Sequence, residues 1–87
     1  MLQSNYYFFS MEITFKYHGR FTDLFEKKKE ILSVKSRTAE ALRKELEGVD
    51  VRFRESVYQL AQNNKIITGN DPITAAEVDV FPPFSGG

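Results

Sequence analysis

Two short segments of alternating polar and apolar side chains, one near each end of the chain, most constrain how this sequence can fold. Residues 12–17 (Glu-Ile-Thr-Phe-Lys-Tyr) alternate strictly, and residues 77–81 (Glu-Val-Asp-Val-Phe) alternate as far as Val80 and end on an aromatic residue. A period of two is typical of a strand that is buried on one face and exposed on the other. Each segment is therefore predicted to be a half-buried strand with its apolar face toward a core.

One amphipathic helix is predicted between these two strands. Thr38 is the predicted N-cap, and Glu40 follows in the first turn, where the helix dipole favours a negative charge. A single apolar stripe at helical spacing is formed by Ala39, Leu42 and Leu46. Gly48 stands where a left-handed residue would end the helix, so we expect a helix of about ten residues that lies across a sheet.

Three further segments complete the predicted sheet. Residues 31–34 are predicted to return antiparallel to the first strand, with Leu32 and Val34 facing inward. Residues 57–61 favour a strand whose inward face is ambiguous between the two sets of alternate residues. Residues 66–68 are predicted to form a very short strand after a turn.

The residues after Gly19 are predicted to be a connection between strands that contains Asp23, with Phe21, Leu24 and Phe25 as its apolar members. Three consecutive lysines at residues 27–29 come next. They fit either a solvated turn or a basic docking patch. The turn is favoured because the formal net charge of the whole chain is zero.

The order strand, strand, helix, strand, short strand, strand predicts the α+β class, with one main helix packed across a mixed sheet of about five strands. The first and last strands are expected to be central and parallel, which is the β-grasp, or ubiquitin-like, arrangement. A chain of 87 residues has room for one compact domain. We assign this domain to residues 11–81, between an N-terminal extension at residues 1–10 and an extended tail at residues 82–87.

The composition argues against several classes of function. Twelve basic and twelve acidic residues cancel, which removes the electrostatic basis for binding nucleic acid or an anionic membrane. Without cysteine there is no thiolate metal site and no cysteine nucleophile. His18 is the single histidine, and we interpret it as an exposed or satisfied residue at a strand end rather than a catalytic base. We therefore expect neither a metal site nor an active site of the chain's own.

Residues 1–10 lack the positive start and the small-residue cleavage site of a secretory signal. We interpret them as an upstream extension or as the product of a start codon placed too early. No apolar stretch is long enough to span a bilayer. The expected location is therefore the cytoplasm.

The C-terminal tail points to a chemical role. Pro82 and Pro83 cannot donate to a strand ladder, so they end the sheet and favour an extended, semi-rigid stalk. Gly86 and Gly87 then form a tip without side chains. Such a tail suits insertion into a narrow channel of another protein, where a carboxylate could attack the α-phosphorus of ATP. The alternative is that the two glycines are a frayed end.

The segment Phe-Pro-Pro-Phe-Ser-Gly-Gly at residues 81–87, after Glu-Val-Asp-Val at residues 77–80, resembles the terminus of the MoaD/ThiS family of ubiquitin-like sulphur carriers. The small subunit of molybdopterin synthase is the member that it resembles. The resemblance extends over residues 11–87. It implies that Gly87 is adenylated by an activating enzyme, is converted to a thiocarboxylate, and donates sulphur to a cyclic pterin precursor in molybdenum cofactor biosynthesis.

The resemblance also implies partners. These are the large catalytic subunit of molybdopterin synthase in a heterotetramer, an ATP-dependent adenylyltransferase and a sulphur donor protein. The chain itself would bind no cofactor, because ATP is used by the activating partner. The tail residues expected in the partner's channel are Gly86, Ser85, Phe84, Pro83 and Pro82. Phe81 is either a core residue or an anchor at the interface.

Two alternatives remain open. One is a sulphur carrier for thiamine thiazole formation or another thiolation pathway, although Phe-Pro-Pro argues against the thiazole case. The other is a ubiquitin-like binding module or protein tag, in which the two glycines are inert or are joined to lysines.

Overall fold

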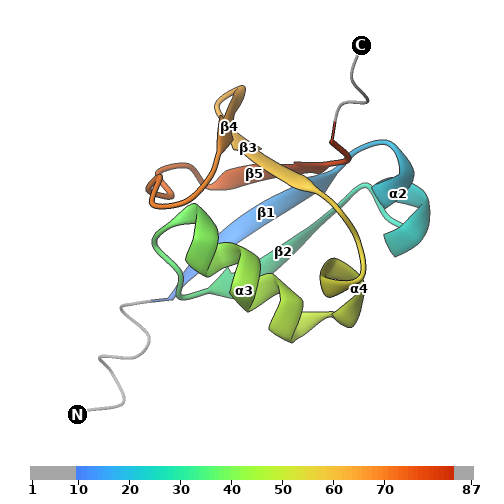
Figure 1. Ribbon diagram of the computed structural model, residues 1–87, viewed down its shortest axis with the longest axis horizontal. Helices are drawn as coiled ribbons and strands as arrows, with labels where there is room; N and C mark the ends of the chain where they lie inside the picture. Colours follow the sequence, from blue (N-terminus) through green and yellow to red (C-terminus); the bar gives the residue numbers. More distant parts are fainter. Residues whose placement is uncertain (1–9, 84–87) are drawn as a thin grey trace.

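A five-stranded sheet with strand order β2-β1-β5-β3-β4 forms the centre of the computed structural model, which describes residues 10–83. Helix α3 lies across one face of this sheet (Figure 1). The strands are β1 (Met11–Tyr17), β2 (Lys29–Val34), β3 (Gln59–Gln62), β4 (Lys65–Ile67) and β5 (Glu77–Phe81). The helices are α2 (Arg20–Phe25), α3 (Ala39–Val49) and α4 (Val51–Arg54).

The first and last strands lie side by side in the sheet and run parallel, as predicted. Thr14 of β1 pairs with Glu77 of β5, and Tyr17 pairs with Val80. Strand β2 is antiparallel to β1, and β3 is antiparallel to both β5 and β4. The carboxyl end of β5 therefore lies beside the end of β1, close to the start of α2 (Figure 1).

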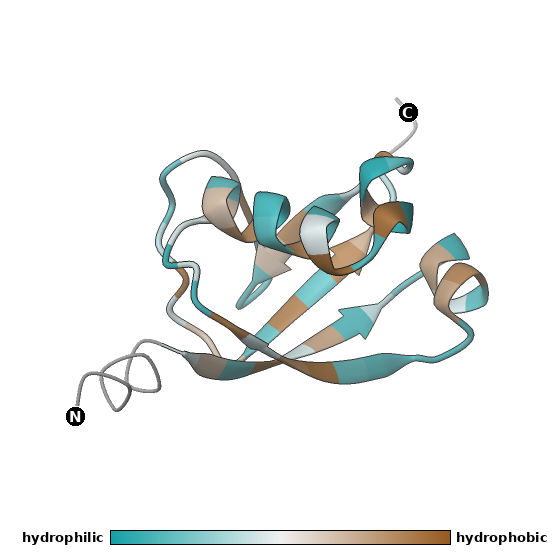
Figure 2. Cartoon of the chain, turned by 90° about the horizontal axis from the view of Figure 1, so that it is seen from below, coloured by the Kyte–Doolittle hydropathy of each residue, from teal (hydrophilic) through white to brown (hydrophobic). Residues whose placement is uncertain are grey.

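The core lies between the sheet and α3. Thr38 caps the helix, since its hydroxyl accepts a hydrogen bond from the Ala41 backbone N–H at 3.3 Å. In Figure 2, where α3 lies over the sheet, apolar and polar bands alternate along the long strands, as a half-buried sheet requires. Of the residues predicted to face the core, Leu32 is only partly buried and packs against the core. The others are buried: Ile13, Phe15, Tyr17, Val34, Ala39, Leu42, Leu46, Val78 and Val80.

Two short helices were not expected. Residues 20–25, predicted only as a connection between strands, form α2, which was missed. Phe21 and Phe25 are both buried one helical turn apart, and the Phe25 ring stacks on Tyr17 with centroids 4.6 Å apart. The helix ends at Glu26, which takes a left-handed conformation without being a glycine. The sequence therefore carries no glycine signal for its C-terminus.

The predicted end of the main helix is also wrong in detail. Gly48 is an ordinary helical residue inside α3, and the helix continues to Val49. Asp50 then adopts an extended conformation, and its side chain accepts a hydrogen bond from the Arg52 backbone N–H at 2.9 Å. Because Asp50 caps the following helix α4, the chain turns there without a left-handed residue.

The remaining strands resolve what the sequence left open. On β3 the inward residue is Leu60, preceded by the buried Tyr58, whereas Val57 is 65% exposed. Asn63 and Asn64 both have positive φ and form the tight turn into β4. Of the lysine run, residues 27 and 28 lie in an exposed turn, and Lys29 begins β2.

The loop between β4 and β5 is held by one buried side chain. The Gln62 amide donates to the Pro72 carbonyl oxygen at 2.7 Å and accepts from the backbone N–H groups of Thr74 and Ala75. This fixes where β5 starts. Within residues 10–83, no helix is long and apolar enough to cross a membrane.

Candidate functional site

The predicted site residues follow the carboxyl end of β5. Phe81 is the last residue of that strand, and Pro82 and Pro83 come directly after it. Phe84, Ser85, Gly86 and Gly87, which carry the predicted chemistry, lie outside the described residues. The structure therefore defines the place from which the tail leaves and the surface beside it.

The ladder between β1 and β5 ends at the point where the tail begins. The His18 backbone N–H donates to the Val80 carbonyl oxygen at 3.0 Å, one residue beyond the end of β1. Pro82 has no N–H group to continue the pairing. Pro82 is partly buried, and Pro83 is exposed. The sheet thus ends at Phe81, and the predicted extended conformation of the tail stays a prediction.

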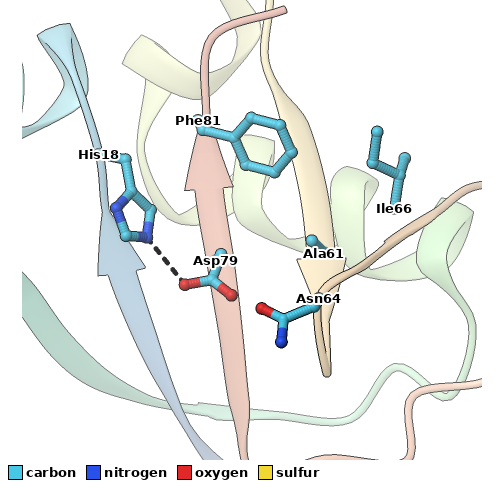
Figure 3. A pocket seen from close by; sticks show the side chains of 6 residues that line it. All are labelled: His18, Ala61, Asn64, Ile66, Asp79 and Phe81. Carbon is cyan, nitrogen blue, oxygen red and sulfur yellow. Dashed lines mark hydrogen bonds and ion pairs between the residues drawn. The ribbon is translucent and has the colours of Figure 1, made fainter.

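A shallow hollow of about 390 Å³ lies beside this exit, on the sheet face turned away from α3 (Figure 3). We call it the sheet hollow. Its lining residues come from the end of β1, from β3, from β4 and the turn before it, and from β5: they are His18, Ala61, Asn64, Ile66, Asp79 and Phe81.

One side of the sheet hollow is apolar. Ala61 of β3 pairs with Asp79 of β5 on one side and with Ile66 of β4 on the other. Ile66 is 46% exposed although it is a large aliphatic residue, and Phe81 is partly buried on the other side of β3 (Figure 3). An aliphatic and an aromatic side chain that line one hollow give a contact surface that a partner protein could cover.

The other side is polar. His18 Nε2 lies 2.8 Å from Asp79 Oδ1, and the His18 side chain is half exposed. This confirms the interpretation of His18 as an exposed, satisfied residue at a strand end. Farther from the tail on the same face, Lys16 Nζ lies 2.9 Å from Glu77 Oε1, and this hydrogen bond is the main reason that the pKa of Lys16 is raised. The sheet face is thus polar toward the start of β5 and apolar toward its end.

The sequence analysis assigned Phe81 to this site but missed Ala61, Ile66 and Asp79. Asp79 and Phe81 are the outward positions of an alternating strand, which was the available signal. Ala61 and Ile66 join them only because β3 lies between β5 and β4, a pairing that local periodicity cannot reveal. Among residues 10–83, no cluster of three or more histidine, aspartate or glutamate side chains could hold a metal ion.

These features define the class of the domain. One main helix across a five-stranded mixed sheet, with its first and last strands parallel and adjacent, is the β-grasp fold. No protein-family model matches the sequence, and a search of curated proteins finds no relative.

Two solved structures share this fold with the chain. One is the Pyrococcus furiosus protein described as molybdopterin converting factor, subunit 1. It has 21% sequence identity and a TM-score of 0.70, and the match covers 85% of this chain and 99% of that one. The other is the Haloferax volcanii HVO 2177 protein, with 19% identity and a TM-score of 0.66 over 91% of this chain and 89% of that one. At these identities, the likeness establishes the fold.

Proposed function

We propose that this chain is a ubiquitin-like sulphur carrier of molybdenum cofactor biosynthesis. In this proposal Gly87 is adenylated by an ATP-dependent adenylyltransferase and then converted to a thiocarboxylate. The sulphur passes to a cyclic pterin precursor while the chain is bound to the large subunit of molybdopterin synthase. The chain supplies the reacting group, and its partners supply the active sites and bind ATP.

The observation that carries the proposal is how β5 ends. This strand lies between β1 and β3, so its course is fixed by neighbours on both sides. It runs directly into Pro82 and Pro83, which cannot extend the ladder. A rigid strand followed by two prolines suits delivery of a terminal group to a site on another protein. The fold that the chain shares with the Pyrococcus furiosus protein supports the same function.

The chemistry needs only the carboxylate of Gly87. One of its oxygens attacks the α-phosphorus of ATP, and pyrophosphate leaves. The acyl carbon of the resulting adenylate is then open to attack by a sulphur nucleophile, with AMP as the leaving group. The Gly-Gly tip has no side chains that would obstruct a narrow channel.

The sheet hollow is the contact surface that we propose for the large subunit and, in turn, for the activating enzyme. Phe81 and Ile66 would supply the apolar anchor, and the pair of His18 and Asp79 would form a polar rim. An apolar centre with a polar edge is the usual composition of a protein interface. The surface lies directly beside the exit of the tail, so docking and insertion of the tail can occur together.

The test is ATP-dependent adenylation of the purified chain by an activating enzyme of the sulphur-carrier class. Pyrophosphate release and the mass of the acyl-adenylate are measured for the chain ending at Gly87 and for a matched chain with one alanine added after Gly87. We expect adenylation of the first and none of the second, because the added residue displaces the carboxylate. Equal adenylation of both chains, or of neither, would contradict the proposal.

The purified chain also distinguishes the proposed function from the other carrier pathway, the protein tag and the binding module. A carrier for thiazole formation would be adenylated but would not support conversion of the pterin precursor. A protein tag would instead be found joined to lysines of other proteins. A simple binding module would keep its partner after deletion of residues 85–87.

A further inference from the structure

Gly19 occupies a position in which a side chain would meet the tail. A Cβ atom placed on Gly19 would lie 3.3 Å from both Cγ and Cδ of Pro82. That is closer than nine in ten of the contacts that Cβ atoms make in proteins, so Pro82 would have to move by a few tenths of an ångström. Gly19 also has φ near +59°, which disfavours any other residue there. Pro82 thus lies directly against the bare backbone of the turn between β1 and α2.

The backbone around Gly19 is tied on both sides. Before it, the His18 N–H donates to the Val80 carbonyl oxygen at 3.0 Å, which joins the turn to β5. After it, the Thr22 N–H donates to the Gly19 carbonyl oxygen at 3.1 Å, and the buried Phe21 anchors α2 in the core. Because the turn is held at both ends, a side chain at Gly19 would displace Pro82 rather than the turn.

Gly69 provides a natural comparison. Its φ is also positive, near +54°, but a Cβ atom there would meet nothing within 4 Å. An alanine at either position would meet the strain of a positive φ, and at Gly19 the ψ of −135° adds to that strain. Only an alanine at Gly19 adds a contact with the tail.

We propose that Gly19 is a positioning residue for the C-terminal tail. Its missing side chain lets Pro82 close over the β1–α2 turn, and this contact sets the direction in which the chain leaves β5. The importance of that direction for delivering Gly87 rests on the proposed function. The contact itself and its effect on the tail do not.

The direction in which the chain leaves β5 can be measured by NMR on the whole chain. The one-bond Cα–Hα residual dipolar coupling of Pro83, compared with those of the sheet, reports the orientation of the backbone just after Pro82. This coupling is compared in the parent and in its Gly19→Ala and Gly69→Ala variants. We expect the same Pro83 coupling in the parent and in Gly69→Ala, and a changed coupling in Gly19→Ala.

A Pro83 coupling that is the same in all three proteins would overturn the proposal, and so would an equal change in Gly19→Ala and Gly69→Ala. Because the ψ of −135° makes an alanine at Gly19 especially strained, Pro82→Ala separates the contact from the strain: it removes Cγ and Cδ and leaves the turn intact. We expect a changed Pro83 coupling in Pro82→Ala, and a parent-like coupling there would equally refute the proposal. The experiment uses neither ATP nor sulphur, so its failure is distinct from failure of the proposed function.

Discussion

His18 and Asp79 are 61 residues apart in the sequence, yet their side chains meet across the parallel strands β1 and β5 with Nε2 and Oδ1 2.8 Å apart. His18 follows the last residue of β1, and Asp79 lies at the middle of β5. The pair therefore exists only because the two ends of the chain are adjacent in the sheet. It forms the polar side of the sheet hollow, close to the exit of the tail (Figure 3).

Breaking this pair should change binding more than folding. Both side chains are partly exposed, and such pairs contribute about 1 kcal/mol or less to stability. Asp79→Asn keeps the shape of the side chain and removes its charge. Urea unfolding at neutral pH should show a change in the free energy of unfolding below about 1 kcal/mol. A loss of several kcal/mol would mean that the pair is structural rather than part of a contact surface.

The two most exposed isoleucines offer a matched test of the sheet hollow. Ile66 lines the hollow and is 46% exposed, whereas Ile31 lies on β2 at the opposite edge of the sheet and is 64% exposed. Neither residue belongs to the buried core. Ile66→Asp should weaken binding to the large synthase subunit at least about tenfold, which is the effect of losing about 1.4 kcal/mol. Ile31→Asp should leave binding unchanged.

Titration calorimetry with the separately purified large subunit provides the measurement. Equal weakening by the two substitutions would exclude the sheet hollow as the specific contact. Thermal unfolding of both variants serves as the control, and their midpoints should lie close to that of the parent.

The two buried tyrosines should respond in opposite ways to loss of the hydroxyl group. The Tyr17 hydroxyl donates a hydrogen bond to the Glu30 carboxylate, whereas the buried Tyr58 hydroxyl has no partner among the described residues. Tyr17→Phe should therefore reduce the free energy of unfolding by about 1.5 kcal/mol or more, and Tyr58→Phe should leave it unchanged or raise it by about 1 kcal/mol. Urea unfolding at pH 7 measures both, and a loss of stability in Tyr58→Phe would contradict this account.

Stability should also fall at alkaline pH. The pKa of Tyr17 is raised, first by burial and then by the hydrogen bond to Glu30. A tyrosine in the unfolded chain ionises near pH 10, so the folded state holds its proton more tightly. This contribution to stability is complete below about pH 10 and is lost as the pH rises through the folded pKa.

Between its unfolded and folded pKa, one tyrosine of this kind lowers the free energy of unfolding by up to about 1.4 kcal/mol per pH unit. Burial also raises the pKa of Tyr58. Tyr17→Phe should flatten the decline above about pH 10, and Tyr17→Phe combined with Tyr58→Phe should flatten it further. Urea unfolding at closely spaced pH values gives the slope. An unchanged slope in Tyr17→Phe would show that another group is responsible.

The helix pair α3 and α4 depends on Asp50. Its side chain caps α4 through the Arg52 N–H and accepts a hydrogen bond from the Arg52 guanidinium at 2.7 Å, which keeps the pKa of Asp50 low. Asp50→Ala should reduce the free energy of unfolding by about 1 kcal/mol, whereas Asp50→Asn should retain most of the cap. Because the folded pKa is the lower one, the charge contribution is present above about pH 4 and is lost as the pH falls through the folded pKa. The free energy of unfolding is measured as the pH is lowered. An equal decline in Asp50→Asn and in the parent would contradict the role assigned to the Asp50 charge.

The spacing of apolar residues along the sequence predicted the strands and the helix that bury one face in the core. The strands around Phe15 and Val80 and the helix around Leu42 were correct, since burial of one face imposes its period on the sequence. Helix α2 was missed because it has only six residues and is stabilised by stacking of Phe25 on Tyr17, a contact between different elements. The prediction that Gly48 ends the main helix was wrong because Asp50 caps the next helix, so no left-handed residue is needed there.

The site was predictable only in part for the same reason. Phe81 could be identified because it lies in the segment that resembles a carrier tail. Ala61 and Ile66 reach the sheet hollow through the order of the strands, which depends on long-range pairing. Gly19 carries no sign in the sequence that it lies against Pro82, since that contact follows from the parallel register of β1 and β5.

The central claim, that Gly87 carries sulphur, is tested most directly by the mass of the C-terminal peptide. The protein is isolated from its own cells under conditions that limit hydrolysis, and the peptide containing residues 81–87 is fragmented in a mass spectrometer. We expect a population in which one oxygen of the Gly87 carboxylate is replaced by sulphur. A carboxylate that stays unmodified in the cell, and also after incubation with ATP, an activating enzyme and a sulphur donor, would contradict it.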